Sequence, residues 1–188
     1  RRAKRRINFY QGQTAIFEHY GIQKQIDNAF YRQVWLPCGG YIVIDQTEAL
    51  VAIDVNTGRY VGKKTAGRLE DTIVKTNLEA AKEIVRQMRL RDLGGIIVLD
   101  FIDMEDAADK KKLLDHFTKS LERDRARTRV GKVSSLGLIE ITRKRTGESV
   151  TESITTVCPM CEGRARIPST DTVAVWIERD MRRRTNDP

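Results

Sequence analysis

Leu50-Val-Ala-Ile-Asp54-Val-Asn56 and Ile96-Ile-Val-Leu-Asp100-Phe-Ile-Asp103 are the two stretches that decide the fold of this chain. Each has the length and apolar composition of a buried strand, and each places an aspartate where the strand stops being covered. If the two strands are neighbours, Asp54 and Asp100 converge at one end of a sheet. Two carboxylates that converge there could hold a divalent cation.

The surrounding sequence predicts a mixed α/β layer architecture in the order strand, strand, helix, strand, helix, strand. Apolar residues recur at helical spacing over residues 16–31, 69–90 and about 105–127. Residues 41–45 and 49–54 predict a hairpin, a polar loop follows at 57–64, and a last strand is expected at 135–142. The length of 188 residues suits one main domain.

The composition is basic, with 34 Lys and Arg against 26 Asp and Glu and a formal net charge of +8. This excess suits a polyanionic partner, of which nucleic acid is the commonest. A basic protein without such a partner is the alternative. No apolar stretch approaches the roughly 20 residues of a membrane span, so we expect a soluble, intracellular protein.

The carboxylates suit Mg²⁺, which is usually held by one or two carboxylates plus waters and so leaves positions open for a phosphate and an attacking water. Asn56 lies two residues after Asp54, on the same strand face, where its amide could orient a water or the carboxylate. Asp103 lies within reach of the loop that follows Asp100. The alternative is that both aspartates only end their strands.

Basic residues concentrate between positions 119 and 145, where nine Lys or Arg accompany three acidic residues. Such a strip suits neutralisation of phosphates with release of counterions, although part of it could be a solvated helix face. Aromatic residues make up only 6% of the chain, so contacts to the nucleic-acid backbone are expected rather than base readout. The candidate contacts are Arg125, Arg127, Arg129, Lys132, Arg143 and Lys144.

The motif Cys158-Pro-Met-Cys161-Glu-Gly163 has the spacing of a metal-binding pair, because two thiolates on such a turn can occupy two corners of a tetrahedron. It supplies half of a structural Zn²⁺ site, and the same pair from a second protomer is the economical completion. A redox function is the alternative. A redox pair would be expected at a helix N-terminus, which Pro159 and Gly163 do not suggest.

Several stretches of the chain, taken in order, match one family. They are Leu36-Pro-Cys-Gly-Gly40, Thr47-Glu48-Ala49, Ile53-Asp54-Val-Asn56, Thr76-Asn77-Leu78-Glu79-Ala80-Ala81, Arg89-Leu-Arg-Asp-Leu-Gly-Gly95, Asp100-Phe-Ile-Asp-Met104, Asp124-Arg-Ala-Arg127 and Cys158-Pro-Met-Cys161. These motifs closely resemble the catalytic region of the ribonuclease E/G family. The resemblance runs from about residue 16 to 168, and motifs this long and numerous are highly specific.

The resemblance implies a Mg²⁺-dependent endoribonuclease that cuts single-stranded RNA in rRNA processing and mRNA decay, leaving 5′-phosphate and 3′-hydroxyl ends. Asp54 and Asp100 correspond to the family's catalytic metal-binding aspartates, and Asn56 to its supporting amide. Cys158 and Cys161 correspond to its zinc-link, which implies a homodimer with a Zn²⁺ shared between protomers and, in the full-length enzyme, possible higher homo-oligomers. The expected location is a bacterial cytoplasm or a plastid stroma.

The resemblance also implies a domain division. Residues 31–154 would form a deoxyribonuclease I-like catalytic subdomain, 155–168 the zinc-link, and 169–188 the start of a small C-terminal domain. Residues 1–30 would be the last piece of a ribonuclease H-like subdomain, so we expect a part of a larger enzyme. The competing function is a non-catalytic RNA-binding or assembly module that retains the fold.

Overall fold

The computed structural model describes residues 7–58, 66–134, 136–145, 147 and 149–185. Most of the loop predicted at 57–64 therefore lies outside the described residues. The chain divides into two compact units, one that ends at Ser153 and one that begins at Ile154. The first unit holds the sheet and its covering helices.

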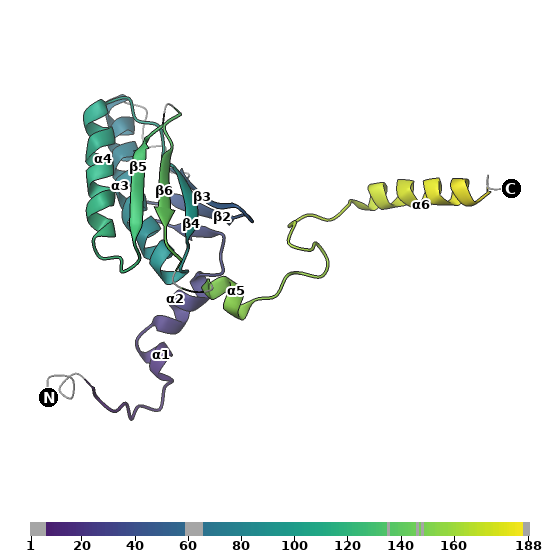
Figure 1. The fold of residues 1–188 in the computed structure, drawn as a ribbon, viewed down its shortest axis with the longest axis horizontal. Coiled ribbons are helices and arrows are strands. Elements are labelled where there is room, and N and C mark those ends of the chain that lie inside the picture. The colour runs from purple at the N-terminus through teal and green to yellow at the C-terminus, as the bar shows by residue number, and fades with distance from the viewer. Residues whose placement is uncertain (1–6, 59–65, 135, 146, 148, 186–188) are drawn as a thin grey trace. The chain divides into compact units, whose positions relative to one another are not determined.

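Six strands form one sheet in the order β1-β2-β3-β4-β6-β5 (Figure 1). The strands β3 and β4 run parallel, and the other neighbouring pairs run antiparallel. The bounds are β1 (Gln33–Trp35), β2 (Tyr41–Gln46), β3 (Leu50–Asn56), β4 (Gly95–Asp100), β5 (Thr128–Val133) and β6 (Ile139–Arg143). The predicted mixed α/β class is confirmed.

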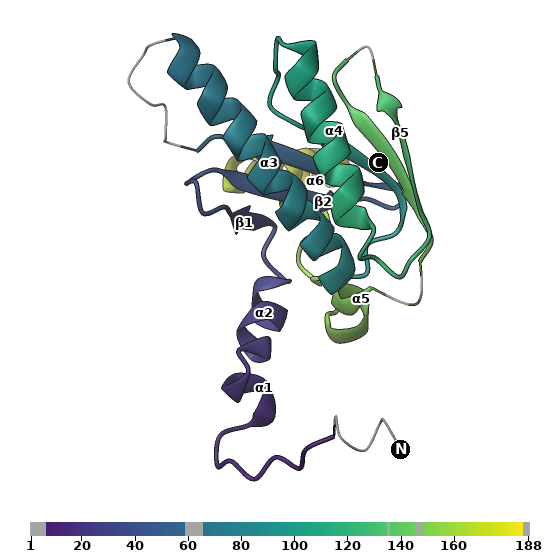
Figure 2. The ribbon, with the colours of Figure 1, turned by 90° about the vertical axis from the view of Figure 1, so that its left-hand side faces the viewer.

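Two long helices, α3 (Ala66–Leu90) and α4 (Ala107–Leu121), cover one face of this sheet (Figure 2). The core lies between them and the strands, because alternate strand residues point to this face. Its largest fully buried side chains include Ile53, Ile84, Met88, Leu99 and Phe117. The opposite face carries Asp54, Asn56 and Asp100, the predicted site residues.

The first unit also contains the short helices α1 (Ile16–His19) and α2 (Ile22–Asn28). The helix α5 (Val150–Ile154) lies where the two units meet in the sequence, and α6 (Thr170–Thr185) belongs to the second unit. The helix predicted over 16–31 is wrong in one respect, because it is two helices separated by Gly21 in the left-handed region at φ 65°. No helix among the described residues has the length and apolarity needed to cross a membrane.

Two strands were not predicted. One is β5 at residues 128–133, which follows a helix that ends at Leu121 rather than at the predicted residue 127. The other is β1, which has only three residues. The last predicted strand begins at Ile139 rather than at residue 135.

Candidate active site

Asp54 and Asp100 are paired directly across the parallel strands β3 and β4. Both side chains are exposed, whereas Ile53 and Leu99, which precede them, are fully buried. Neighbouring strands lie about 4.8 Å apart, and paired residues point to the same side of a sheet. The structure therefore brings the two predicted carboxylates together on the face that the helices leave open.

The electrostatics of this pair favour a bound cation. Partial burial raises the pKa of Asp100, and the negative charges of Asp54 and then of Asp103 raise it further. Two neighbouring carboxylates oppose the ionisation of this carboxyl group, so a cation bound among the carboxylates would stabilise its ionised form. Asn56 donates a hydrogen bond from Nδ2 to Oδ2 of Asp54 at 2.7 Å and so fixes the orientation of that carboxylate.

A buried asparagine is hydrogen-bonded to the backbone just after Asp100. The side chain of Asn77, on α3, donates to the carbonyl oxygen of Ile102 at 2.8 Å and accepts from the Ile102 N–H at 3.1 Å. Asn77 is fully buried, so both of its polar groups depend on these bonds. This positioning residue was not singled out from the sequence, although a polar residue on an apolar helix face was a usable signal.

The loop between β1 and β2 is packed against the end of β3 that carries Asn56. A Cβ added at Gly40 would lie 2.7 Å from the carbonyl oxygen of Asn56 and 2.9 Å from Cγ2 of Thr76. The backbone at residue 40 therefore approaches closer than any side chain would allow. This contact fixes the backbone beneath Asn56.

The donor set at the open face is small. Among the described residues, no group of three or more His, Cys, Asp or Glu is placed to hold one metal ion. A pair of carboxylates is nevertheless the usual protein contribution to Mg²⁺, whose other ligands are waters and substrate phosphates. The chemistry of Asp54 and Asp100 therefore fits Mg²⁺ better than an ion that needs a full protein cage.

The second candidate metal centre lies on the turn that contains Cys158 and Cys161, both free thiols. The carbonyl oxygens of these residues accept hydrogen bonds from the N–H groups of Glu162 and Arg164, each at 2.8 Å. Hydrogen bonds from the backbone N–H groups of Cys161 and Met160, and from the Cys161 thiol, hold the pKa of the Cys158 thiol below its ordinary value. The turn thus favours a thiolate, the form that binds Zn²⁺.

The basic residues predicted to contact nucleic acid are mostly exposed. Arg127, Arg129 and Lys144 line a shallow hollow of about 410 Å³ together with Ile96 and Thr142. Arg129 pairs with Thr142 and Thr142 pairs with Ile96, so the hollow lies on the same open face as Asp100. Arg125 and Lys132 are exposed next to it in sequence.

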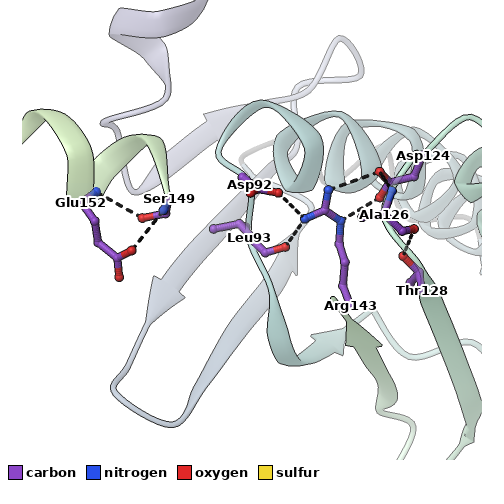
Figure 3. Close-up of polar contacts among 8 residues, drawn as sticks. All are labelled: Asp92, Leu93, Asp124, Ala126, Thr128, Arg143, Ser149 and Glu152. Carbon is purple, nitrogen blue, oxygen red and sulfur yellow. Dashed lines mark hydrogen bonds and ion pairs between the residues drawn. The ribbon is translucent and has the colours of Figure 1, made fainter. Parts of the chain in front are cut away.

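Arg143 differs from the other predicted contacts. Its side chain is only 4% exposed. Its guanidinium donates to both carboxylate oxygens of Asp124, to Asp92 Oδ1 and to the carbonyl oxygen of Leu93, at 2.6–3.2 Å (Figure 3). Burial opposes the ionisation of Asp124, but bonds from Arg143 and from the Ala126 N–H outweigh it and hold the pKa of that carboxyl below its usual value. Arg143 is therefore a buried structural residue in this fold.

Comparison with known proteins relates this chain to one family. The sequence model of the Ribonuclease E/G family matches residues 1–146. Ribonuclease G of Salmonella typhimurium (strain SL1344) and of Escherichia coli (strain K12) are each 43% identical to it over 176 residues, which is 94% of this chain and 35% of theirs. Ribonuclease E of Haemophilus influenzae is 44% identical over 174 residues, or 18% of its length. The chain spans about a third of the ribonuclease G relatives.

Proposed function

Because the chain belongs to the ribonuclease E/G family, we propose that it carries the hydrolytic site of a Mg²⁺-dependent endoribonuclease that cuts single-stranded RNA. The observation that carries this proposal is the direct pairing of Asp54 with Asp100 across β3 and β4. Residues 31–154 are then the deoxyribonuclease I-like catalytic subdomain, and the products carry 5′-phosphate and 3′-hydroxyl ends.

Asp54, Asp100 and Asn56 each have a role in this reaction. Asp54 and Asp100 would hold Mg²⁺, which when bound polarises the scissile phosphate and lowers the pKa of a coordinated water. Asn56 keeps the Asp54 carboxylate in one orientation through the 2.7 Å hydrogen bond. Water oxygen bonds to phosphorus as the P–O3′ bond breaks, so the phosphate stays on the 5′ end of the downstream product and a proton goes to the 3′ oxygen.

The exposed cations near the hollow are the proposed contacts to the RNA backbone. Arg127, Arg129 and Lys144 share the open face with the carboxylates, and Arg125 and Lys132 extend this group. Phosphate contacts of this kind hold a single strand without reading its sequence. We leave Arg143 out of the group, because its guanidinium is buried and paired with carboxylates.

We further propose that Cys158 and Cys161 bind a structural Zn²⁺ shared with a second copy of the chain. The lowered pKa of the Cys158 thiol and the turn that presents both thiols support this assignment. One chain offers two of the four ligands that such a site needs, and a two-fold axis supplies the other two. The product is a homodimer whose assembly depends on the metal.

Incubation of the natural-length enzyme with a 5′-labelled single-stranded RNA tests the catalytic proposal. Internal cuts that require Mg²⁺, stop with EDTA and disappear in Asp100→Asn are expected. The control is Asp109→Asn, which changes a partly exposed carboxylate on α4 and should leave cleavage intact. RNA that is bound but never cut would refute the proposal and favour a binding or assembly module.

A further inference from the structure

Two aromatic residues lie together on the open face of the sheet. Trp35, the last residue of β1, is paired in register with Tyr41, the first residue of β2. Their rings contact each other edge to face, with centroids 5.3 Å apart and planes at 60°. Trp35 is nevertheless 65% exposed. Most of the indole surface therefore remains uncovered by the described part of the chain.

The loop that joins these two residues is held rigidly. The N–H of Leu36 donates to the carbonyl oxygen of Gly40 at 2.8 Å, and the N–H of Gly39 donates to that of Leu36 at 3.0 Å. Leu36 is buried in the core, and the N–H of Cys38 donates to Oε2 of Glu79 on α3 at 2.8 Å. The ring pair is thus presented by an anchored hairpin, which lowers the entropic cost of binding to it.

The strand register connects this pair to the carboxylates. Trp35 is opposite Tyr41, Tyr41 is opposite Asn56, and Asp54 is opposite Asp100. Asn56 and Asp54 are two residues apart on one strand, so all five side chains belong to the same face. At about 4.8 Å per strand, Trp35 lies roughly 14 Å across the sheet from β4.

We propose that Trp35 and Tyr41 form a stacking platform for an unpaired nucleobase of the RNA whose backbone is cut at Asp54 and Asp100. This inference rests on the proposed function. The separation from the carboxylates assigns the platform to a nucleotide next to the cleaved bond rather than to the bond itself. An exposed indole offers a base an apolar surface without selecting its identity.

The platform also gives a physical reason for a preference for single strands. A base within a duplex already has both faces covered by its neighbours, so it can stack on Trp35 only after it is unpaired. An unpaired base makes the contact without that cost. The hairpin that packs against Asn56 would then favour single-stranded over double-stranded RNA, close to the bond that is cut.

The test measures RNA binding by the natural-length enzyme in EDTA, so that its outcome does not depend on cleavage. Trp35→Ala should weaken binding of a single-stranded oligonucleotide about tenfold, within the range for one stacked base. Trp35→Phe should restore most of the affinity. Trp176→Ala, which removes an exposed tryptophan from α6, is the matched control and should bind like the parent.

An abasic scan of the oligonucleotide identifies the contacted base. One abasic position should weaken binding by the parent by the same factor and cause no further loss in Trp35→Ala, since both changes remove one contact. Additive losses, or equal effects of Trp35→Ala and Trp176→Ala, would overturn the platform even if Mg²⁺-dependent cleavage is observed. Coupling without cleavage would support the platform and refute the proposed reaction.

Discussion

We expect loss of the interior salt bridge of Arg143 to lower the free energy of unfolding by a large and measurable amount. Arg143→Met removes the guanidinium that bonds Asp124, Asp92 and the Leu93 carbonyl, while keeping an apolar chain of similar length (Figure 3). The side chain of Asp124 is 3% exposed, so it would remain buried without its partner. Loss of one partner of a buried pair costs about 3–5 kcal/mol, and we expect about 4 kcal/mol here.

Urea unfolding of the 188-residue chain, followed by circular dichroism at 222 nm, measures this loss. Arg32→Met is the control, because the Arg32–Asp45 pair is largely exposed and should contribute less than about 1 kcal/mol. Adding Asp124→Leu to Arg143→Met should recover part of the loss, since it removes the unpaired charge. A loss below about 1 kcal/mol, or no greater than that of Arg32→Met, would refute the reasoning.

Acid titration provides an independent check of the same network. The pKa of Asp124 is lowered in the folded protein, so the unfolded chain binds its proton more tightly than the folded one. The stabilisation is therefore complete above the unfolded pKa of about 3.9 and is lost as the pH falls through the folded value. The difference in stability between the parent and Arg143→Met should shrink below about pH 4 and stay constant at neutral pH.

Three further predictions concern the open face and the cysteine turn. The raised pKa of Asp100 means that ionisation of this carboxyl destabilises the fold. Asp100→Asn in EDTA should therefore add about 0.5 kcal/mol to the free energy of unfolding at pH 7, and this gain should disappear below about pH 3.9. Urea titrations at both pH values would detect the difference. Charge reversal of Arg127 and Arg129 should flatten the slope of log K against log salt concentration for RNA binding by roughly 0.7 for each phosphate that is no longer neutralised. The control Arg86→Glu, on α3, should leave this slope unchanged. An unchanged slope in both variants would place the RNA elsewhere. The parent should contain about one zinc ion per two chains, and Cys158→Ala should remove this zinc and weaken the dimer in sedimentation experiments. A parent protein that is free of zinc and still dimeric would contradict the shared site.

The pairing of the two aspartates could be predicted because the sequence carries it locally. Each apolar run defines its strand, and the aspartate at its end marks where burial stops. The parallel direction of the two strands is made possible by the helix that connects them, which occupies residues 66–90 and was predicted at 69–90. Local pattern and crossover connection together predict that the two aspartates lie at the same end of the sheet if their strands are neighbours, which the structure confirms.

The errors arose where the local pattern was ambiguous. Residues 128–133 form an edge strand with two basic residues and a glycine, and their weak apolar alternation does not predict a strand. The run of three basic residues at 143–145 predicts a surface position for Arg143, and this prediction is wrong because its side chain is buried. Its alternation with Ile139 and Ile141, which are buried, was the better signal, because period two places all three side chains on the core face.

The two RNA contacts that we propose on the open face respond to different perturbations. The carboxylates lie between the Trp35–Tyr41 platform and the basic hollow, whose Ile96 is four residues, or about 13 Å, from Asp100 along β4. Phosphate contacts at the hollow release counterions, so their removal changes the salt slope and leaves the effect of an abasic site intact. Stacking on Trp35 releases no counterions, so its removal changes base dependence and leaves the salt slope intact. Because the salt slope reports on the basic hollow and the abasic effect reports on Trp35, the two contacts can be tested separately without knowledge of the RNA sequence.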